Sequence, residues 1–287
     1  MLSIGCDAHK RYSQFEAQDG VGKVVDRTKV MHDRGAILEY LARYPEGTPV
    51  ALETVGNWYW IADEIEAAGC LPLLTHAAKA KVMMGHVDKT DKLDANGLAT
   101  LLRNGTLPTV WVPSGLVRDQ RELPRTRIAL SRIRTAIKNR IHATLAKYAL
   151  SPEGTTDLFS KKGRTWLEGA LKSLPPETGG SLKQEIELLD TLSDQIAILE
   201  ARIRDQIRIT TNMQLLKTLP GVGDILAVVI EREMGLIDRF RGPRSFACYS
   251  GTTPKVSSSG GKTHYGRMRQ PVRRQTGKPT STSSPPS

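Results

Sequence analysis

The chain contains few cysteines, and none of its hydrophobic runs is long. Its 3 cysteines, Cys6, Cys70 and Cys248, lie far apart and form no CxxC pair, which argues against a disulfide framework and a cysteine-ligated zinc site. The longest apolar run, residues 225–230, is far shorter than the ~20 residues that span a membrane. Charged residues begin at Asp7, so no signal peptide is visible. These absences predict a protein of the reducing cytoplasm without a membrane partner.

Acidic residues are scarce in two stretches of the chain. Residues 118–147 contain nine basic and two acidic residues, a local charge of +7. Residues 239–287 contain ten basic residues and no acidic one, a local charge of +10. The whole chain carries 41 Lys+Arg against 30 Asp+Glu, a formal charge of +11, so the remainder is mildly acidic. Two basic blocks of this kind predict two contact surfaces for a nucleic-acid backbone.

The residue pattern predicts an α/β domain over residues 1–112. Short apolar segments bounded by turn residues predict strands, and longer segments between them predict helices. Strands are expected near residues 2–6, 12–17, 23–30, 48–53 and 70–74, and helices near residues 32–44, 58–68 and 91–103. Three early strands followed by alternating helices and strands is the element order of an RNase H-like fold.

Residues 113–210 are expected to form a helical connector. Apolar side chains at spacings of three and four predict one long helix over residues 116–149, with basic residues on its other faces. After a Pro- and Gly-rich breaker at residues 175–180, a second helix over residues 182–209 carries apolar residues seven apart. This seam fits either an antiparallel hairpin with the first helix or a coiled coil that joins two copies. Three basic residues of the first helix are predicted to contact nucleic acid: Arg132, Lys138 and Arg140.

A mainly helical C-terminal domain is predicted over residues 211–267. Residues 219–223, Leu-Pro-Gly-Val-Gly, lie between helical stretches and resemble the turn of a helix-hairpin-helix. Gly221 and Gly223 would let backbone N–H groups approach a phosphate closely. The same sequence also forms ordinary tight turns. The basic segment that follows favours contact with nucleic acid.

Four acidic residues are candidates for metal-dependent chemistry. Asp7 and Glu53 end the first and fourth predicted strands, which are neighbours in an RNase H-like sheet, so we expect them at one carboxyl edge. Asp91 and Asp94 lie three apart on one face of a helix. Converging carboxylates repel one another unless cations neutralise them, and Mg²⁺ prefers such hard oxygen ligands. Two Mg²⁺ ions about 4 Å apart could hold the attacking and leaving oxygens of a phosphodiester displacement.

The segments that carry these acids resemble the RuvC-like Asp-Glu-Asp-Asp domain of insertion sequence 110 family transposases. They are residues 5–10 (GCDAHK), 52–54 (LET) and 89–95 (KTDKLDA). Three later segments resemble the C-terminal transposase domain of the same family: residues 219–223 (LPGVG), 249–254 (YSGTTP) and 259–262 (SGGK). The resemblance covers about residues 1–267, in the order that the family shows.

This resemblance implies a DNA recombinase that mobilises its own element under the guidance of a structured RNA. The acidic tetrad would bind Mg²⁺, and a serine of the second domain would attack DNA and form a covalent phosphoserine link. That serine corresponds to Ser259, with Ser257 and Ser258 as the nearest alternatives. Lys262 or Arg267 would hold the phosphate. The tetrad of one protomer would work with the serine of another, which predicts a dimer or tetramer.

Residues 268–287 depart from the family pattern. Gly, Pro, Ser and Thr dominate there, and Met268 and Val272 are the only apolar residues besides proline, so we expect a disordered tail at a truncated or frameshifted end. Two other functions therefore stay open. One is a structure-selective, Mg-dependent endonuclease of the junction-resolving type, which needs no serine. The other is a catalytically defective derivative that still binds nucleic acid.

Overall fold

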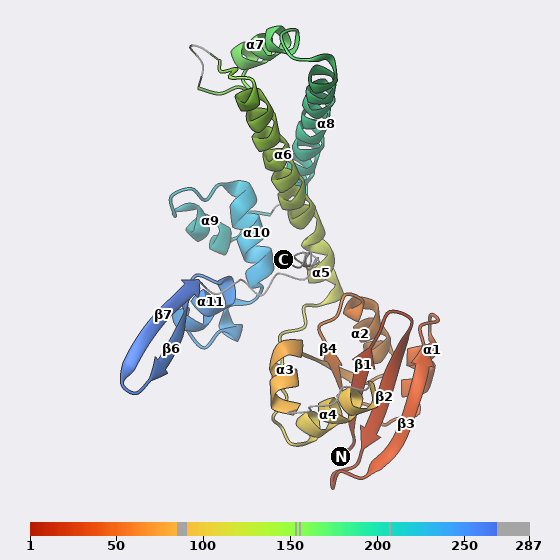
Figure 1. Cartoon of the computed structure of the whole chain (residues 1–287). Coiled ribbons are helices and arrows are strands. Elements are labelled where there is room, and N and C mark those ends of the chain that lie inside the picture. The colour runs from red at the N-terminus through yellow and green to blue at the C-terminus, as the bar shows by residue number, and fades with distance from the viewer. Residues whose placement is uncertain (85–90, 153, 155, 207, 269–287) are drawn as a thin grey trace, which may run out of the picture. The chain divides into compact units, whose positions relative to one another are not determined.

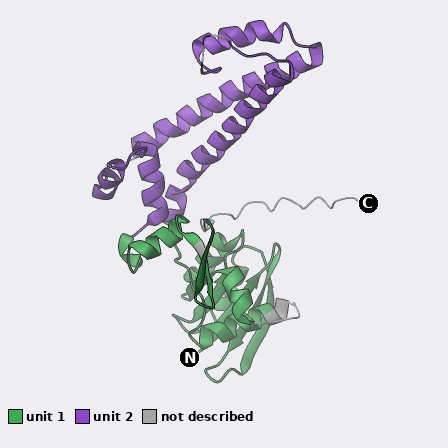
Figure 2. Cartoon of the chain, turned by 60° about the vertical axis from the view of Figure 1, so that its left-hand side comes forward, with its two compact units in different colours: residues 1–115, 237–287 green, residues 116–236 purple. Residues whose placement is uncertain are grey.

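A computed structural model describes residues 1–84, 91–152, 154, 156–206 and 208–268 (Figure 1). The chain folds into two compact units, which Figure 2 shows in different colours. The first unit comprises Met1–Gly115 together with the chain from Ile237 onward, and the second comprises Leu116–Leu236. The expected tail lies outside the described residues from residue 269 onward.

A five-stranded sheet forms the centre of the first unit. Its strands follow the order β3-β2-β1-β4-β5, in which β1–β2 and β2–β3 are antiparallel while β4 and β5 run parallel to β1 and to each other. The strands are β1 (Ser3–Ala8), β2 (Tyr12–Gln18), β3 (Val24–Met31), β4 (Pro49–Glu53) and β5 (Leu71–Thr75). The predicted neighbouring of the first and fourth strands is confirmed, and this mixed α/β unit fits an RNase H-like domain.

Helices cover both faces of this sheet (Figure 1). They are α1 (Ala36–Leu41), α2 (Trp58–Ala67), α3 (Ala77–Met84) and α4 (Asp91–Arg103). Successive strand residues point to opposite faces, so Ile4 and Cys6 of β1 enter the apolar core with α1 and α2. Ala51 of β4 instead packs with Leu98 of α4 and Ala80 of α3. The odd-numbered positions of β1 therefore face α4.

Two helical predictions in this unit need correction. The helix expected over residues 32–44 is shorter in the structure, where α1 spans only the six residues Ala36–Leu41. Helix α3 was not predicted at all, since only Ala80 of its eight residues is buried and the segment carries no apolar stripe.

Glu64 of α2 stabilises the short α1. Its buried carboxylate accepts hydrogen bonds from the backbone N–H groups of Gly35, Ile37 and Leu38, at 2.8, 3.2 and 3.4 Å. These are N–H groups that the first turn of a helix cannot satisfy internally. We expect Glu64→Ala to lower the free energy of unfolding by about 1–3 kcal/mol. Chemical denaturation measures the change, and the exposed Glu66 provides the control, since Glu66→Ala should stay within about 0.5 kcal/mol.

The second unit is helical. Its elements are α6 (Glu122–Lys147), α7 (Lys161–Leu171), α8 (Pro176–Gln206), α9 (Thr211–Lys217) and α10 (Asp224–Met234), and α5 (Gly115–Gln120) leads into it. The single helix expected over residues 116–149 is thus divided into α5 and α6 at Arg121. Pro124 lies in the first turn of α6, where a backbone N–H has no partner within the helix and its absence therefore breaks no helical hydrogen bond. The expected breaker before residue 182 is also wrong, because α8 begins at Pro176. Proline favours a first helical position.

The predicted heptad seam lies inside the second unit. Leu182, Leu189, Ile196 and Ile203 are each at most 3% exposed, and α8 packs against α6. Ile141 and Leu145 of α6 share a core with the first two of these leucines. The seam therefore closes an intramolecular hairpin, and pairing of two copies through it stays a prediction.

The chain from Ile237 onward returns to the first unit. It forms a 3-10 turn (Ile237–Arg239), α11 (Pro243–Ser250) and a separate two-stranded sheet of β6 (Pro254–Ser259) and β7 (Lys262–Met268). The Arg239 guanidinium lies 4.4 Å from the ring centre of Trp111 and 4.4 Å from that of Tyr249, an arrangement that gains cation–π energy. Within the described ranges, no helix is both long enough and apolar enough to cross a membrane.

Candidate functional site

Asp7 and Glu53 lie at the carboxyl ends of adjacent parallel strands. The last residues paired between β1 and β4 are Cys6 and Leu52, and Asp7 and Glu53 follow them directly. Because side chains alternate along a strand, both carboxylates point to the face that α4 covers. Asp7 is 8% exposed, and its Oδ2 lies 2.9 Å from Nε2 of His9. Two of the four predicted acids are thus neighbours on one face.

Helix α4 crosses β1 at Gly5 with almost no space between the backbones. A Cβ at Gly5 would lie 2.1 Å from the backbone oxygen of Ala95 and 2.7 Å from the backbone nitrogen of Ala99. Asp94 precedes Ala95 and is partly buried. Asp91 begins the helix, one turn before Ala95, and its side chain lies outside the described residues. The close crossing places the start of α4 over β1, the strand that carries Asp7 near its carboxyl end.

The described side chains do not by themselves assemble a complete metal site. Among them, no group of three or more His, Cys, Asp and Glu residues is arranged to hold a metal ion. Asp7, Glu53 and Asp94 therefore share one side of the sheet without forming such a group, and residues 85–90 are not described. The hard oxygen donors at the strand ends suit Mg²⁺, while the full tetrad stays a prediction.

His9 has a better-defined place beside Asp7 than the sequence indicated. Its ring stacks on Tyr12 with 4.7 Å between ring centres, and Nζ of Lys29 lies 3.8 Å from the Tyr12 ring centre. The Asn57 side chain donates a 2.8 Å hydrogen bond to the backbone oxygen of His9. These contacts fix the imidazole next to the carboxylate. In the sequence, only the Asp-x-His spacing of Asp7 and His9 indicated that the imidazole lies near this carboxylate.

A buried polar cluster ties α4 to β2. Glu16 of β2 is fully buried and accepts a 2.8 Å hydrogen bond from Nε of Arg27. Asn96 of α4 donates to the same carboxylate. Gln18 donates to the hydroxyl of Thr100 at 3.2 Å. Buried polar groups must be paired in this way, so the cluster fixes the position of the helix that begins with Asp91.

Ser259 lies at the tip of a β-hairpin rather than in an irregular loop. It pairs with Lys262 across the two-residue turn of Gly260 and Gly261, whose φ angles of +57° and +77° are typical of a type I′ turn. Ser257 pairs with His264, so alternation places these four polar side chains on one face of the hairpin: Ser257, Ser259, Lys262 and His264.

The alternative nucleophile Ser258 and the alternative phosphate contact Arg267 lie elsewhere on the hairpin. Ser258 pairs with Thr263 and therefore faces the opposite side of the hairpin. Arg267 lies where the register shifts between the pairs Val256–Tyr265 and Pro254–Met268, and alternation does not assign it a face. Lys262 is thus the basic residue that shares the Ser259 face.

The predicted phosphate-binding turn joins α9 to α10. Gly221 has a φ of +82°, and Gly223 is the N-terminal cap residue of α10. Nζ of Lys217 at the end of α9 lies 2.6 Å from Oδ1 of Asp224 at the start of α10, an ion pair that closes the base of the turn. A helix, a turn and a second helix thus follow one another here, and the helix-hairpin-helix itself stays a prediction.

The three predicted basic contacts on α6 have different surroundings. Arg132 is exposed. Nζ of Lys138 lies 4.4 Å from the ring centre of Phe159, and Nε of Arg140 lies 2.5 Å from Oε1 of Glu185. Lys138 and Arg140 therefore already interact with other residues of the second unit.

Arg132 should accordingly contribute more to DNA binding than its neighbours on α6. We expect Arg132→Ala to weaken non-specific binding of duplex DNA about three- to tenfold and to reduce the slope of log affinity against log salt by about 1. Arg127 is the matched control, because it already donates to Glu200 at 2.9 and 2.6 Å. Fluorescence anisotropy over a salt series measures both variants. Equal losses for the two would contradict the assignment.

Comparison with known proteins gives a consistent result for both halves of the chain. Residues 4–150 match a family model described as a transposase, the DEDD domain of IS110-type elements. Residues 213–276 match a model of transposases of the IS116/IS110/IS902 family. The two matched ranges of this chain together contain all five predicted catalytic residues: Asp7, Glu53, Asp91, Asp94 and Ser259.

Several curated transposases are similar to this chain, two of them over at least three quarters of their own length. A "Probable family 20 transposase" of Pseudomonas aeruginosa is 26% identical over 274 residues, which cover 92% of this chain and 78% of the relative. The transposase for insertion sequence element IS1328 of Yersinia enterocolitica is 25% identical, with 90% of this chain and 75% of the relative covered. The transposase for insertion sequence element IS1111A of Coxiella burnetii is 24% identical over 61% of this chain and 48% of the relative.

Proposed function

Because this chain belongs to the IS110 family of insertion-sequence transposases, we propose that it cuts and exchanges DNA strands through a covalent link between Ser259 and DNA. Family membership makes it a transposase, an enzyme that acts on DNA. The observation that carries the finer proposal is the position of Asp7 and Glu53, which directly follow the last paired residues of two adjacent strands on the face that α4 covers. We further propose, from the resemblance of its motifs, that an RNA encoded by the element guides it.

The carboxylates are proposed to hold Mg²⁺, in keeping with the divalent-metal use that a DEDD domain suggests. Asp7, Glu53, Asp91 and Asp94 would be the ligands. Bound Mg²⁺ would stabilise charge on the reacting phosphate and lower the pKa of a coordinated hydroxyl. His9 would orient the Asp7 carboxylate through their 2.9 Å contact, and the buried Glu16 cluster would hold α4 in place.

The serine is proposed to act as the nucleophile. Its Oγ would attack phosphorus and form a phosphoserine ester while one P–O bond of the DNA backbone breaks. The serine proton leaves, and the departing oxygen takes up a proton. A hydroxyl of another DNA end then attacks the phosphoserine, which restores Ser259 and joins the new strands. A serine hydroxyl is a weak nucleophile unless it is activated, so Lys262 on the same face is proposed to bind the phosphate and offset its charge.

The active site is proposed to combine two protomers. In this scheme the carboxylates of one copy act on the DNA that is attached to the serine of another copy. The basic surface of α6 and the turn between α9 and α10 would bind the DNA and the guide RNA. A homo-oligomer, a dimer or a tetramer, follows from this scheme.

Covalent capture tests the proposal directly. We incubate the full chain with Mg²⁺, DNA from the ends of the element and the adjacent RNA, and then separate the products on a denaturing gel. We expect a protein–DNA adduct that disappears with EDTA and with Asp7→Asn. Glu66→Gln is the matched control, because Glu66 is an exposed carboxylate on α2, and this variant should retain the adduct.

Other outcomes identify other functions. DNA cleavage without an adduct would support a hydrolytic endonuclease of the junction-resolving type. Salt-sensitive DNA binding without cleavage would support a catalytically defective binding protein. Either result would contradict the covalent mechanism while leaving the family membership intact.

A further inference from the structure

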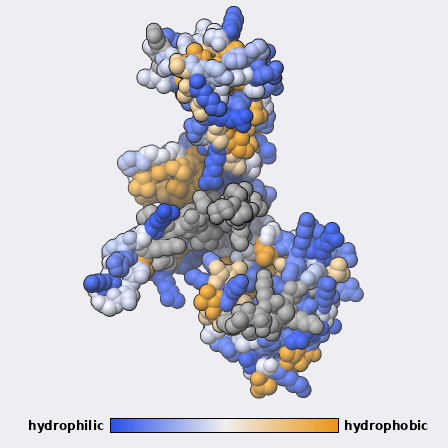
Figure 3. Space-filling view, viewed as in Figure 1, coloured by the Kyte–Doolittle hydropathy of each residue, from blue (hydrophilic) through white to orange (hydrophobic). Residues whose placement is uncertain are grey.

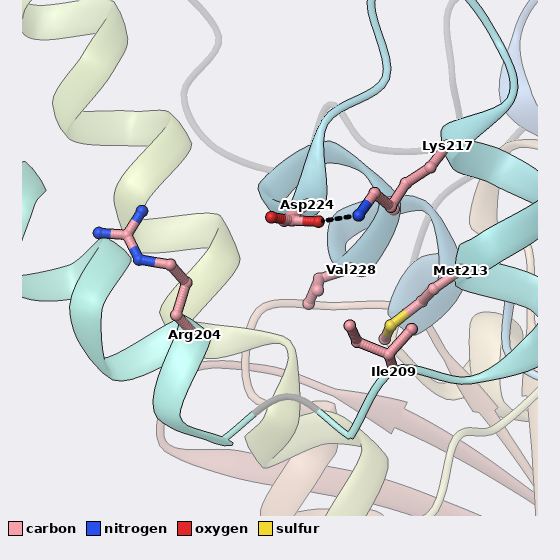
Figure 4. Close-up of a pocket in the computed structure, with 7 residues that line it drawn as sticks. Arg204, Ile209, Met213, Lys217, Asp224 and Val228 are labelled. Carbon is pink, nitrogen blue, oxygen red and sulfur yellow. Dashed lines mark ion pairs between the residues drawn. The ribbon is translucent and has the colours of Figure 1, made fainter.

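A small cavity lies in the second unit, between the end of α8 and the pair α9–α10 (Figure 4). Its volume is about 200 Å³, below the roughly 300–1,000 Å³ of pockets for drug-sized ligands. A cavity of this size suits a single flat ring system. The residues that line it come from three helices and the segment that joins two of them: Arg204, Ile209, Met213, Lys217, Asp224, Ala227 and Val228.

The floor of the cavity is apolar. Met213, Ala227 and Val228 are 2%, 1% and 5% exposed, and Ile209 at the mouth is 59% exposed. Figure 4 shows the side chains of Ile209, Met213 and Val228 gathered below the Lys217–Asp224 ion pair. An aromatic ring that entered the cavity would bury its faces against aliphatic carbon and the methionine thioether.

Charged groups lie on two sides of the cavity, since Figure 4 shows Arg204 apart from the Lys217–Asp224 ion pair and with its guanidinium directed away from it. Arg204 comes from α8 and Lys217 from α9, and Asp224 is paired with Lys217 at 2.6 Å. Two cations and one anion leave an excess positive charge beside the apolar floor. The combination fits a flat ring that carries a phosphate, and the second Asp224 oxygen offers an acceptor for an amino group on the ring.

The cavity adjoins the turn between α9 and α10. Lys217 and Asp224 are the residues that bracket this turn, residues 218–223. Three large apolar side chains near the turn are exposed: Leu215 by 63%, Leu219 by 53% and Leu226 by 42%. Figure 3 shows hydrophobic side chains gathered over α9 and α10. A nucleic-acid strand that follows the turn would therefore pass the mouth of the cavity over an apolar surface.

We propose that this cavity receives one unstacked base of a single-stranded nucleic acid, with Arg204 at the edge of the cavity holding a backbone phosphate of that strand. The inference rests on the proposed function only in that a nucleic acid is the bound polymer. Bases that leave a helical stack bind between apolar side chains in pockets of this kind, and single-stranded segments of structured RNA display such bases. The site would thus recognise single-stranded rather than duplex segments.

The experiment observes the cavity itself. We label the methyl groups of all 7 methionines with ¹³C in the full chain and assign the Met213 signal with Met213→Leu. The probes are two five-nucleotide DNA strands, one with a thymine and one with an abasic site at the centre. We expect the thymine strand to shift the Met213 signal and to bind about fivefold or more tightly than the abasic strand. The exposed Met31 of β3 should not shift.

Matched variants locate the phosphate contact. Arg204→Ala should weaken the thymine strand about three- to tenfold, while Arg202→Ala, an exposed arginine of α8 that does not line the cavity, should leave the affinity unchanged. Equal Met213 shifts with both strands would overturn the base pocket, as would binding without a Met213 shift or no binding at all. A failure here leaves the covalent-capture result untouched. A Met213 shift without an adduct would overturn the covalent mechanism alone.

Discussion

Replacing Ser259 with alanine is expected to abolish the covalent protein–DNA adduct, with a loss of at least about 10³-fold in strand exchange. The reason is chemical, since no other atom of residue 259 could form the ester. Simple DNA binding should be unchanged, because the hydroxyl adds little to the contact with a phosphate backbone. Gel detection of the adduct and anisotropy with the same DNA measure the two properties separately.

Ser258 and Ser257 provide the controls for this prediction. Ser258 pairs with Thr263 and faces away from Ser259, so Ser258→Ala should retain the adduct. Ser257 shares the face of Ser259 but lies opposite His264, two residues from the turn, and Ser257→Ala should also retain it. An adduct that persists in Ser259→Ala and disappears in either control would show that the nucleophile had been assigned to the wrong serine.

Gly5→Ala is expected to be the most damaging single substitution in the first unit. The added methyl group would lie 2.1 Å and 2.7 Å from backbone atoms of α4, and backbone cannot move aside as a flexible side chain can. Overpacking of a core costs about 1–3 kcal/mol and occasionally more, and we expect about 3 kcal/mol or more here. Thermal unfolding followed by circular dichroism measures the loss.

The same substitution should also impair function in molecules that remain folded. Shifting α4 away from β1 would move Asp91 and Asp94 relative to Asp7, so adduct formation should fall further than the folded fraction does. Gly56→Ala is the control, because no atom lies within 4 Å of its added methyl position. Wild-type stability in Gly5→Ala would mean that α4 does not cross β1 as described.

Several parts of the fold could be predicted from local pattern. The strands near Asp7 and Glu53 are short apolar segments that end in an acid, and strand order then follows from the element order. The seam of Leu182, Leu189 and Ile196 recurs every seven residues, which local spacing fully specifies. In such cases neighbouring residues along the chain carry the information.

Other features depend on partners that are distant in sequence. The carboxylate of Glu16 is buried because Arg27 and Asn96 reach it, and no local pattern links residue 16 to residue 96. The requirement for glycine at position 5 comes from the backbone of α4, about 90 residues later. By contrast, the Ser259 hairpin carried a local signal in the Gly260–Gly261 turn between two polar segments, and the expectation of a mainly helical domain overlooked it.

The hairpin that carries Ser259 would also affect when the proposed reaction can occur. Its two strands form a sheet of their own, and the residues from Ser257 to Arg267 are exposed. A lone two-stranded hairpin is at best marginally stable in water, so contact with DNA would have to supply much of the free energy that orders it. The nucleophile would then reach its reactive geometry only after the correct substrate is bound. Such coupling would protect the host chromosome from cleavage by unengaged copies of the enzyme.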